Sequence, residues 1–402
     1  MHVNADLHIH SKYSMATSEK MDLPTLAAES GKKGIHLVGT GDCLHPKWLD
    51  EIKKLKENNG VFKLNETVFV LTVEVEDASQ VHHLLIVPSI SKAEELYECM
   101  RTRSNNIDSD GRPNVRLTGE EIAQAARDAG ALIGPAHAFT PWTAMYAYHN
   151  SLKDCYGTMA EYIYFIELGL SADTSYADRI SELRCLTFLS NSDAHSPYVN
   201  KLAREFNRFE MNDISFEELK MAIIREKGRK PVLNVGMYPE EGKYNESACI
   251  RCFKHYTMRE SIIKGWTCSC GGKIKKGVKD RVNELAAYEK PMHPPHRPPY
   301  LHLVPLSEII AMALGIGTNT KGVQKIWNAL IERYGSEVTV LVDADIRDSG
   351  VDERVINAIL AFREGKVKVH PGGGGQYGHV ELSDTKRDFQ NSPEPQKSLF
   401  EF

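Results

Sequence analysis

Short apolar runs alternate with helical patterns over about the first 235 residues of the chain. Runs typical of strands lie at 35–38, 68–75, 83–87, 131–133, 162–168 and 186–189. Helical patterns lie between them at 23–32, 47–57, 92–100, 118–129, 176–183 and 216–226. Such alternation is typical of parallel strands connected by helices, so the sequence predicts an α/β barrel with its chemistry at the carboxyl ends of the strands.

The pattern changes after this region. Clustered cysteines come first, and a proline-rich run at 292–299 then excludes a helix and predicts a stiff connector. Apolar helical patterns follow at 306–314 and 351–363, and the last twenty residues are charged and typical of a disordered segment. We therefore expect four parts: a catalytic barrel at 1–235, a metal-binding module at 236–280, a helical region at 281–380 and a flexible tail at 381–402.

The composition is that of a globular protein, because 42% of the 402 residues are hydrophobic and 26% are charged. The net charge of -5 does not indicate a nucleic-acid binder, so such a function would depend on local basic patches or metal ions. No apolar run approaches the roughly 20 residues of a membrane span, and the first candidate motif begins too early for a signal peptide. The cysteine usage is typical of a reducing compartment, so we expect a cytoplasmic protein that does not contact membranes.

Histidines and carboxylates recur at the ends of the predicted strands. His8 and His10 lie two apart, so their side chains point to the same side of a strand. Comparable clusters follow later strands, and the carboxyl ends of parallel strands lie close together. About nine such side chains suit two or three divalent ions, and the absence of cysteine favours hydrolytic metals such as Zn, Mg or Mn. The predicted ligands are His8, His10, Asp42, His45, Glu74, His83, His137, Asp193 and His195.

Three choices within this ligand set stay open from the sequence: Asp42 against His45, His82 against His83, and Glu74 against Glu76. We favour Glu74 because of its position on the strand. Closely spaced ions lower the pKa of a bridging water to about 7 and hold both oxygens of a phosphoryl displacement, so no serine nucleophile is required. Asp193, His195 and His10 are the expected catalytic residues.

A second group of residues is predicted to contact substrate. Glu167 ends a predicted strand, and Ser171 and Asn191 lie at or just beyond strand ends. The loop after His137 contains five aromatic residues, among them Trp142. This loop is either a lid that packs on the barrel or a wall that stacks an extruded nucleobase.

The cysteine cluster predicts a structural zinc ion. Two close pairs, Cys249 with Cys252 and Cys268 with Cys270, have the spacing of a four-cysteine site. A module this small would not fold without its ion. The basic stretch that follows contains Lys275 and Lys276, and it is either a solvated helix start or a contact for DNA phosphates.

Three features of the C-terminal part suggest DNA and protein partners. The turn around Gly315 and Gly317 resembles a helix–hairpin–helix motif, in which backbone N–H groups approach a phosphate. The glycine-rich run 372–375 is either a backbone nest for a DNA strand or a loose turn. The chain end resembles the motif that binds the sliding clamp (PCNA), although its second terminal aromatic residue is missing. The clamp-binding candidates are Gln396, Leu399, Phe400 and Phe402.

Taken together, the strand-end motifs resemble those of the polymerase and histidinol phosphatase (PHP) superfamily. The matching motifs are Asp6-x-His8-x-His10-Ser11, Gly41-Asp42, Glu74, His82-His83-Leu84, His137 and Ser192-Asp193-Ala194-His195. This resemblance implies a distorted (β/α)7 barrel that typically binds three metal ions. The sequence departs from the pattern at Cys43, where many members have histidine, and at Tyr13 and Ser14, where several have a further histidine.

The whole arrangement resembles the endonuclease Q family. The resemblance implies a DNA-repair endonuclease, chiefly archaeal, that flips a damaged base out of the duplex. It implies cleavage of the phosphodiester on the 5′ side of deaminated bases (hypoxanthine, uracil and xanthine) and of abasic sites. Two alternatives stay open: a PHP-type phosphomonoesterase that acts on a small molecule, and a non-catalytic DNA-binding or clamp-associated protein.

Overall fold

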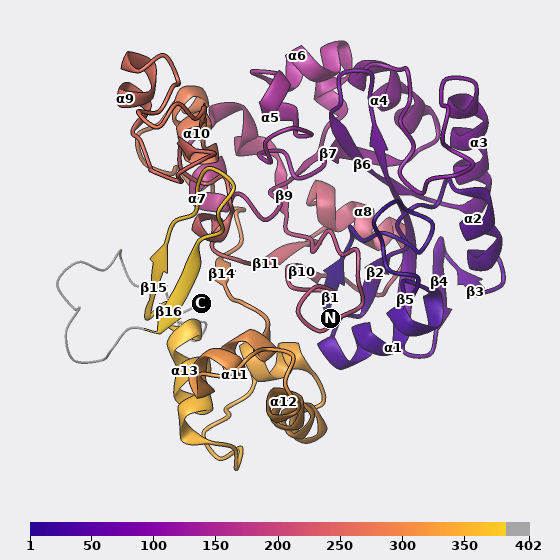
Figure 1. Cartoon of the computed structure of the whole chain (residues 1–402). Coiled ribbons are helices and arrows are strands. Elements are labelled where there is room, and N and C mark those ends of the chain that lie inside the picture. Colours follow the sequence, from indigo (N-terminus) through magenta and orange to yellow (C-terminus); the bar gives the residue numbers. More distant parts are fainter. Residues whose placement is uncertain (383–402) are drawn as a thin grey trace.

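The computed structural model describes residues 1–382. The predicted clamp-binding residues Gln396, Leu399, Phe400 and Phe402 lie outside this range. The N-terminal α/β region is built from strands and helices that follow the predicted alternation (Figure 1). Its main strands are β1 (His2–Asp6), β2 (Leu37–Gly39), β5 (Thr67–Glu76), β6 (His82–Val87), β7 (Leu132–Pro135), β8 (Phe165–Glu167), β9 (Thr187–Leu189), β10 (Phe206–Glu210) and β11 (Lys230–Gly236), and its longer helices are α1 (Leu23–Lys33), α2 (Pro46–Ile52), α3 (Ile90–Arg101), α4 (Gly119–Asp128) and α8 (Phe216–Ile224).

The sheet is mixed rather than parallel, which corrects the expectation from the sequence. Strands β1, β2 and β5 are parallel, but β10 runs antiparallel to β1, and β6 runs antiparallel to both β5 and β7. The link from β5 to β6 spans only residues 77–81, which is too short for the crossover that a parallel pair needs. Strands β8 and β9 pair with each other alone, so the described pairings do not close the sheet into a barrel.

Local sequence explains most element boundaries. Asp22 caps the first turn of α1, where Pro24 lacks only an N–H that would be unpaired in any case. The predicted helix at 47–57 is wrong in its second half, because α2 ends at Ile52 and a hairpin follows. Strands β3 (Lys56–Asn58) and β4 (Val61–Leu64) are joined by Asn59 and Gly60, with φ of 52° and 77°. Asn-Gly is the preferred pair for this turn, so the signal was present in the sequence.

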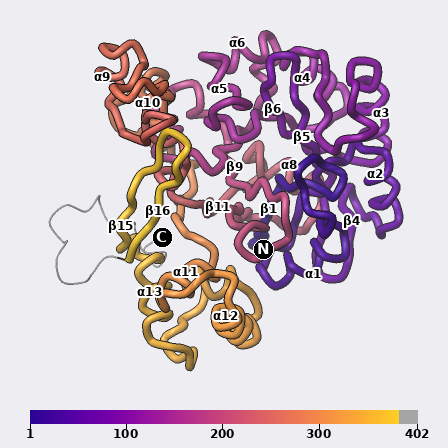
Figure 2. The backbone as a smooth tube through the Cα atoms, in the orientation of Figure 1, coloured from indigo at the N-terminus to yellow at the C-terminus, as the bar shows by residue number. Residues whose placement is uncertain are grey.

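The chain leaves the sheet after β11 and returns to it. The cysteine module contains β12 (Ala248–Cys249), β13 (Ile274–Lys275), α9 (Met258–Ile263) and α10 (Val278–Leu285). Strand β14 (Tyr300–His302) then adds to the sheet edge, parallel to β11. Helices α11 (Leu306–Leu314), α12 (Lys321–Tyr334) and α13 (Glu353–Arg363) form a group at one end of the molecule, as predicted, and the hairpin of β15 (Val367–His370) and β16 (His379–Leu382) extends from them toward the module (Figures 1 and 2).

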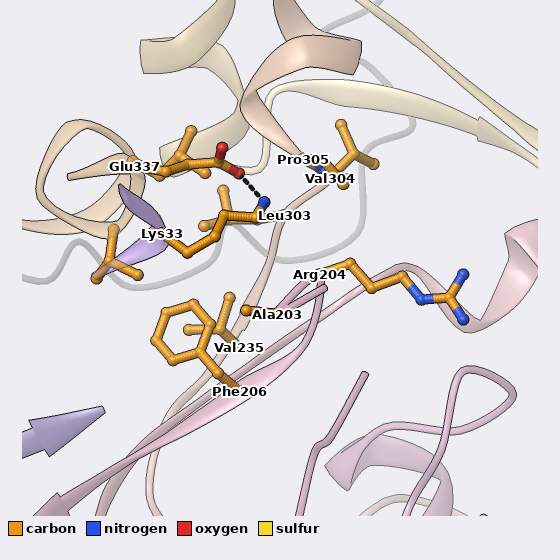
Figure 3. A pocket seen from close by; sticks show the side chains of 11 residues that line it. Lys33, Ala203, Arg204, Phe206, Val235, Leu303, Val304, Pro305 and Glu337 are labelled. Carbon is orange, nitrogen blue, oxygen red and sulfur yellow. Dashed lines mark hydrogen bonds and ion pairs between the residues drawn. The ribbon is translucent and has the colours of Figure 1, made fainter. Parts of the chain in front are cut away.

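Charged side chains attach these later segments to the α/β region. The connector is held by Arg297, which is buried, pairs with Asp178 at 2.9 Å and lies 3.2 Å from the ring centre of Phe188. The helical group is held by Lys33 on α1, whose ammonium lies 2.6 Å from Glu337. Glu337 also accepts hydrogen bonds from the Leu306 N–H and from an indole N–H. Lys33 and Glu337 line a cavity at this junction (Figure 3). No helix within residues 1–382 is long and apolar enough to cross a membrane.

The Glu337→Gln substitution tests this junction. It would leave the Lys33 ammonium, whose side chain is 3% exposed, buried without a counter-charge. We expect the free energy of unfolding to fall by about 3–5 kcal/mol, measured by urea unfolding. The control is Asp343→Asn, which breaks the pair of Arg208 with a carboxylate that is 43% exposed and should cost about 0–1 kcal/mol. Equal losses of unfolding free energy in the two variants would contradict the role of the buried Lys33–Glu337 pair at this junction.

Candidate functional site

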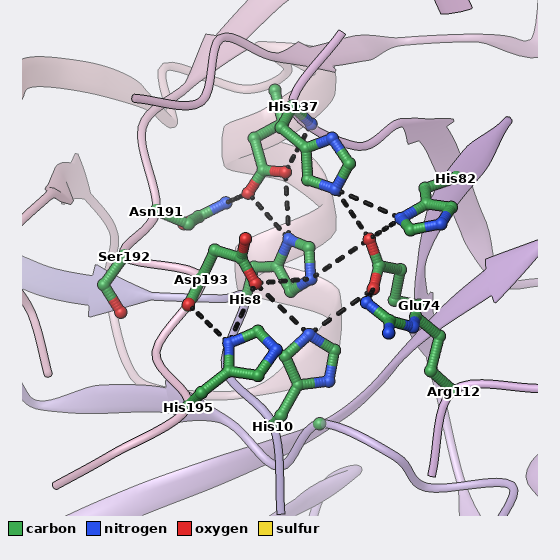
Figure 4. Close-up of polar contacts among 12 residues, drawn as sticks. His8, His10, Glu74, His82, Arg112, His137, Asn191, Ser192, Asp193 and His195 are labelled. Carbon is green, nitrogen blue, oxygen red and sulfur yellow. Dashed lines mark hydrogen bonds and ion pairs between the residues drawn. The ribbon is translucent and has the colours of Figure 1, made fainter. Parts of the chain in front are cut away.

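Glu74, near the end of β5, lies at the centre of a cluster of histidines (Figure 4). Its Oε1 lies 2.7 Å from Nε2 of His137 and 2.6 Å from Nδ1 of His82. Its Oε2 lies 3.4 Å from Nε2 of His10. The side chain is 1% exposed, so a single buried carboxylate joins residues that are far apart in the sequence.

His8 and His10 follow β1 and are oriented by carboxylates behind them. Nδ1 of His8 lies 2.9 Å from Glu167, and Nδ1 of His10 lies 3.1 Å from Asp42. Among the described residues Nε2 of His8 is buried without a hydrogen-bond partner, and Nε2 of His10 faces the carboxylates of Glu74 and Asp193 at 3.4 and 3.2 Å. A carboxylate on one ring nitrogen fixes the tautomer and leaves the other nitrogen free for a metal ion. The two histidines therefore have the geometry of metal ligands.

Asp193 and His195 form the open side of the cluster. Oδ1 of Asp193 lies 3.2 Å from Nε2 of His10 and 3.9 Å from Nε2 of His8. Nδ1 of His195 lies 3.7 Å from the same oxygen. The side chains of Asp193 and His195 are about one-third exposed, at 31% and 32%. Solvent therefore reaches the cluster from this side.

The cluster contains three overlapping groups of ligand atoms. Within each group the ligand atoms lie within 4.8 Å of one another, and the groups share Glu74 and His10. Imidazole nitrogens with carboxylate oxygens suit divalent ions such as Zn²⁺ or Mn²⁺, and shared ligands would place such ions close together. The groups are His8 with His10 and Glu74, His10 with Asp193 and His195, and Glu74 with His82 and His137.

The electrostatic field at the cluster around Glu74 favours a cation. Burial alone would lower the pKa of His8, but the charges of Glu167 and Glu74 outweigh it and raise the pKa to about 9. The pKa of His82 is raised to about 9 in the same way, with Glu74 as the main charge that opposes burial. The same negative potential would hold divalent ions in place of these protons. The residues present therefore fit a metal centre.

Three residues of this region have a left-handed backbone. The φ angles are 52° at Asp42, 29° at His137 and 48° at Asp193. Such angles are uncommon for residues other than glycine and persist where the surrounding contacts hold them. Here each of the three side chains is held by a histidine or a carboxylate of the cluster.

His82, rather than the predicted His83, lies in the cluster. In the β5–β6 ladder His82 is opposite Glu76 and His83 is opposite Val75, so the two histidines point to opposite faces of the sheet. His83 is fully buried among Asp77 at 3.2 Å, the Tyr156 hydroxyl at 2.7 Å and Cys155. Burial lowers its pKa. Its ring has partners on both nitrogens, which indicates a structural role.

Other predicted residues lie behind the cluster rather than in it. Asp42 accepts the Ser11 N–H at 2.6 Å as well as contacting His10, so it positions that ring. His45 precedes α2 and its ring stacks on Tyr13 at 4.5 Å. The predicted substrate contacts Glu167 and Asn191 are also buried, and they hydrogen-bond to each other at 2.8 Å.

The remaining predicted contacts are more exposed. Ser171 is half-buried in the turn after β8. Lys275 lies 3.3 Å from the ring centre of Trp142, whereas Lys276 pairs with Glu284 at 2.5 Å.

Arg112 is a residue of the site that the sequence did not indicate. Its guanidinium lies 3.4 Å from Oε2 of Glu74 and its side chain is 30% exposed (Figure 4). Arg112 comes from a loop 38 positions from Glu74, in a stretch without metal-ligand spacing. Nothing local could have identified it.

The four cysteines lie together as predicted. The Sγ atoms of Cys249 and Cys270 are 3.6 Å apart, and those of Cys252 and Cys268 are 3.5 Å apart. Four sulfurs at 2.3 Å from a tetrahedral zinc ion would be roughly 3.8 Å from one another. All four thiols are free of disulfides. The set fits a structural zinc ion.

Comparison with known proteins gives the family. A crystal structure of the lesion-specific endonuclease PfuEndoQ from Pyrococcus furiosus is 49% identical and superposes with a TM-score of 0.92 over 96% of both chains. The chain belongs to the endonuclease Q family. It is therefore an endonuclease. A second endonuclease Q structure, also 49% identical, holds a 27-mer duplex with an abasic lesion at the active site, and its TM-score is 0.90 over 96% of this chain and 97% of that one.

Curated relatives extend the comparison beyond solved structures. Bacillus subtilis YqxK is 30% identical over 94% of this chain and 99% of its own length. Methanocaldococcus jannaschii MJ0043 is 45% identical over 62% of this chain, a match that spans 32% of that longer protein. Residues 305–366 match the family described as the MJ0043 C-terminal domain, which corresponds to the helical group here.

The neighbouring histidines allow a matched test of the metal centre. His82→Ala removes a ring that contacts Glu74, so we expect the bound metal to dissociate at least about 10- to 100-fold more readily. His83→Ala removes one hydrogen-bond partner of the buried Asp77 carboxylate, which keeps the N–H groups of Ser79 and Val81, and should instead lower stability by about 1–3 kcal/mol with the metal retained. Metal analysis after dialysis measures the first effect, and a metal ion held by the four cysteines would serve as an internal reference. Metal loss in His83→Ala alone would contradict the register argument.

Proposed function

We propose that this endonuclease cleaves DNA on the 5′ side of deaminated bases (hypoxanthine, uracil and xanthine) and of abasic sites. The observation that carries the proposal is the cluster of imidazoles around the buried carboxylate of Glu74, which is partly open to solvent at Asp193, His195 and Arg112. The similarity to endonuclease Q over nearly the whole chain supports a DNA substrate, because one such protein holds lesion-containing duplex at its active site.

The cluster residues would bind and orient the reacting groups. His8, His10, Glu74, His82, His137, Asp193 and His195 would hold divalent ions, which when bound supply an activated water and neutralise phosphate charge. Ser192, beside Asp193, donates its hydroxyl to Asp6 at 2.6 Å, so this hydroxyl is not placed as a nucleophile. Arg112 would bind a phosphate oxygen beside Glu74, because its guanidinium is charged and partly exposed.

Selectivity for damage would come from the low cost of extruding the base. A deaminated base pairs poorly, and an abasic site has no base to unpair, so both leave the helix more easily than a normal nucleotide. The 5′ position of the cut and the range of bases rest on the family resemblance of the sequence motifs.

A nicking assay separates the proposal from its alternative. Duplexes with one deoxyinosine, deoxyuridine, deoxyxanthosine or abasic site should be cut once, 5′ to the lesion, whereas undamaged duplex stays intact. Release of phosphate from a phosphomonoester without nicking would instead support a PHP-type phosphomonoesterase. If metal-loaded protein showed neither nicking nor phosphate release, both the endonuclease proposal and the phosphomonoesterase alternative would be contradicted.

The Asp193→Asn substitution tests the open side of the cluster. The amide keeps the shape of the side chain but weakens a metal ligand, so we expect nicking to fall by more than about 100-fold while lesion DNA still binds. Asp50→Asn, an exposed aspartate on α2 with a side chain 69% exposed, is the control and should cut normally. Full activity of Asp193→Asn would overturn the ligand assignment.

We also propose that the tail binds the sliding clamp, on the basis of the sequence motif at Gln396, Leu399, Phe400 and Phe402. Replacing Phe400 and Phe402 by alanine should abolish binding to the clamp in a pull-down or calorimetric titration. The nicking rate on short duplexes should not change, because the tail lies far along the chain from the metal ligands. Undiminished binding of the clamp by this variant would contradict the motif.

A further inference from the structure

An exposed group of aromatic and basic side chains lies where four segments of the chain meet. We name it the stacking platform: Trp142, Tyr244, Tyr377, Lys243 and Lys275. Trp142 comes from the loop after β7, Lys243 and Tyr244 precede the cysteine module, Lys275 ends β13, and Tyr377 lies in the turn of the β15–β16 hairpin. None of these five residues belongs to the metal cluster.

The aromatic rings alternate with ammonium groups. Lys275 Nζ lies 3.3 Å from the ring centre of Trp142, and the rings of Trp142 and Tyr244 are 5.9 Å apart at 82°. Lys243 Nζ lies 5.5 Å from the ring of Tyr244 and 5.6 Å from that of Tyr377. Aromatic faces interleaved with positive charge are the features by which proteins bind single-stranded nucleic acid.

Two large aromatic side chains are left exposed in this group. Trp142 is 54% exposed and Tyr377 is 70% exposed. Trp142 also has a φ of 100°, which is unfavourable for a residue with a Cβ atom. A tryptophan that is both solvated and strained contributes little to folding, so its position indicates a ligand-binding role.

The platform rests on a well-connected backbone. The glycine-rich turn, which the sequence left open as a nest or a loose turn, is hydrogen-bonded to the segment before the module: the Gly372 N–H donates to Glu240 at 2.8 Å, and the Gly375 N–H donates to Lys243 at 2.9 Å. A Cβ at Gly374 would lie 2.5 Å from the Cys249 carbonyl oxygen, so this close approach requires glycine. Arg281 of α10 donates to the carbonyls of Tyr146 and His149 in the Trp142 loop.

The platform lies near the metal cluster along the chain. Trp142 lies five positions after His137, and this length spans at most about 18 Å. That span corresponds to roughly five base pairs at 3.4 Å each. A DNA strand cut at the cluster would therefore be long enough to reach Trp142.

We propose that the stacking platform binds an unpaired segment of the damaged DNA strand. The bases would stack on Trp142 and Tyr377, and Lys243 and Lys275 would contact the phosphates. This inference rests on the proposed function for its substrate class and adds a second contact, independent of the metal ions. It predicts preference for DNA with unpaired nucleotides beside the lesion.

The test is fluorescence anisotropy of the full-length protein with a labelled oligo-dT strand, and with a lesion duplex that carries unpaired nucleotides. Trp142→Ala and Tyr377→Ala should each weaken binding by roughly 5- to 150-fold, the range for loss of one base–aromatic stack. Trp142→Phe should retain most of the affinity. Lys275→Ala should reduce the slope of log affinity against log salt by about 0.7.

The matched control is Tyr164→Ala. Tyr164 is 41% exposed and precedes β8, at the end of that strand opposite Glu167. Circular dichroism would check that each variant folds. The side chain of Tyr377 is 70% exposed, so its replacement should not disturb the hairpin.

The proposal would be overturned if the alanine variants bound DNA as tightly as the wild type. It would also be overturned if the wild type did not bind oligo-dT. A wild type that binds oligo-dT through these residues but never nicks lesion duplex would contradict the proposed cleavage instead.

Discussion

The site depends on one buried carboxylate. Glu74 is 1% exposed and touches histidines from two strand ends and a loop, together with Arg112. A buried charge is costly unless it is paired, so the strands must deliver these partners accurately. Moving β6 by one residue against β5 would turn His82 away and bring His83 to the cluster face. The register of a single antiparallel pair therefore decides which imidazole joins the centre.

Asparagine side chains hold the sheet together where backbone pairing stops. Strands β8 and β9 lie outside the main sheet, yet the Leu7 N–H donates to Asn191 at 3.0 Å. Asn207 joins Asn191 at 2.9 Å and accepts from the Ser190 N–H, and Asn234 donates to the Phe188 carbonyl at 3.1 Å. All three amides are fully buried. Among the described residues Oδ1 of Asn234 has no hydrogen-bond partner, but the amides of Asn191 and Asn207 are paired. These buried hydrogen bonds fix Asn191 against Glu167, which in turn orients His8.

The later segments are attached by a few buried charges and by close backbone contacts. Arg297 and Lys33 anchor the connector and the helical group, and the hairpin turn approaches the cysteine module through glycines. A zinc ion in that module would therefore fix the position of Lys275 as well as fold the module itself.

The sequence by itself determined the alternation of strands and helices, the four-cysteine set and most of the histidines and carboxylates of the site, because these follow from local periodicity and motif spacing. It also carried the Asn59-Gly60 hairpin signal that the helical pattern concealed. Only the tertiary structure decided His82 over His83, the positioning roles of Asp42 and Glu167, and the presence of Arg112. Strand register, strand direction and the approach of distant loops depend on contacts between segments, and no local pattern of residues encodes them.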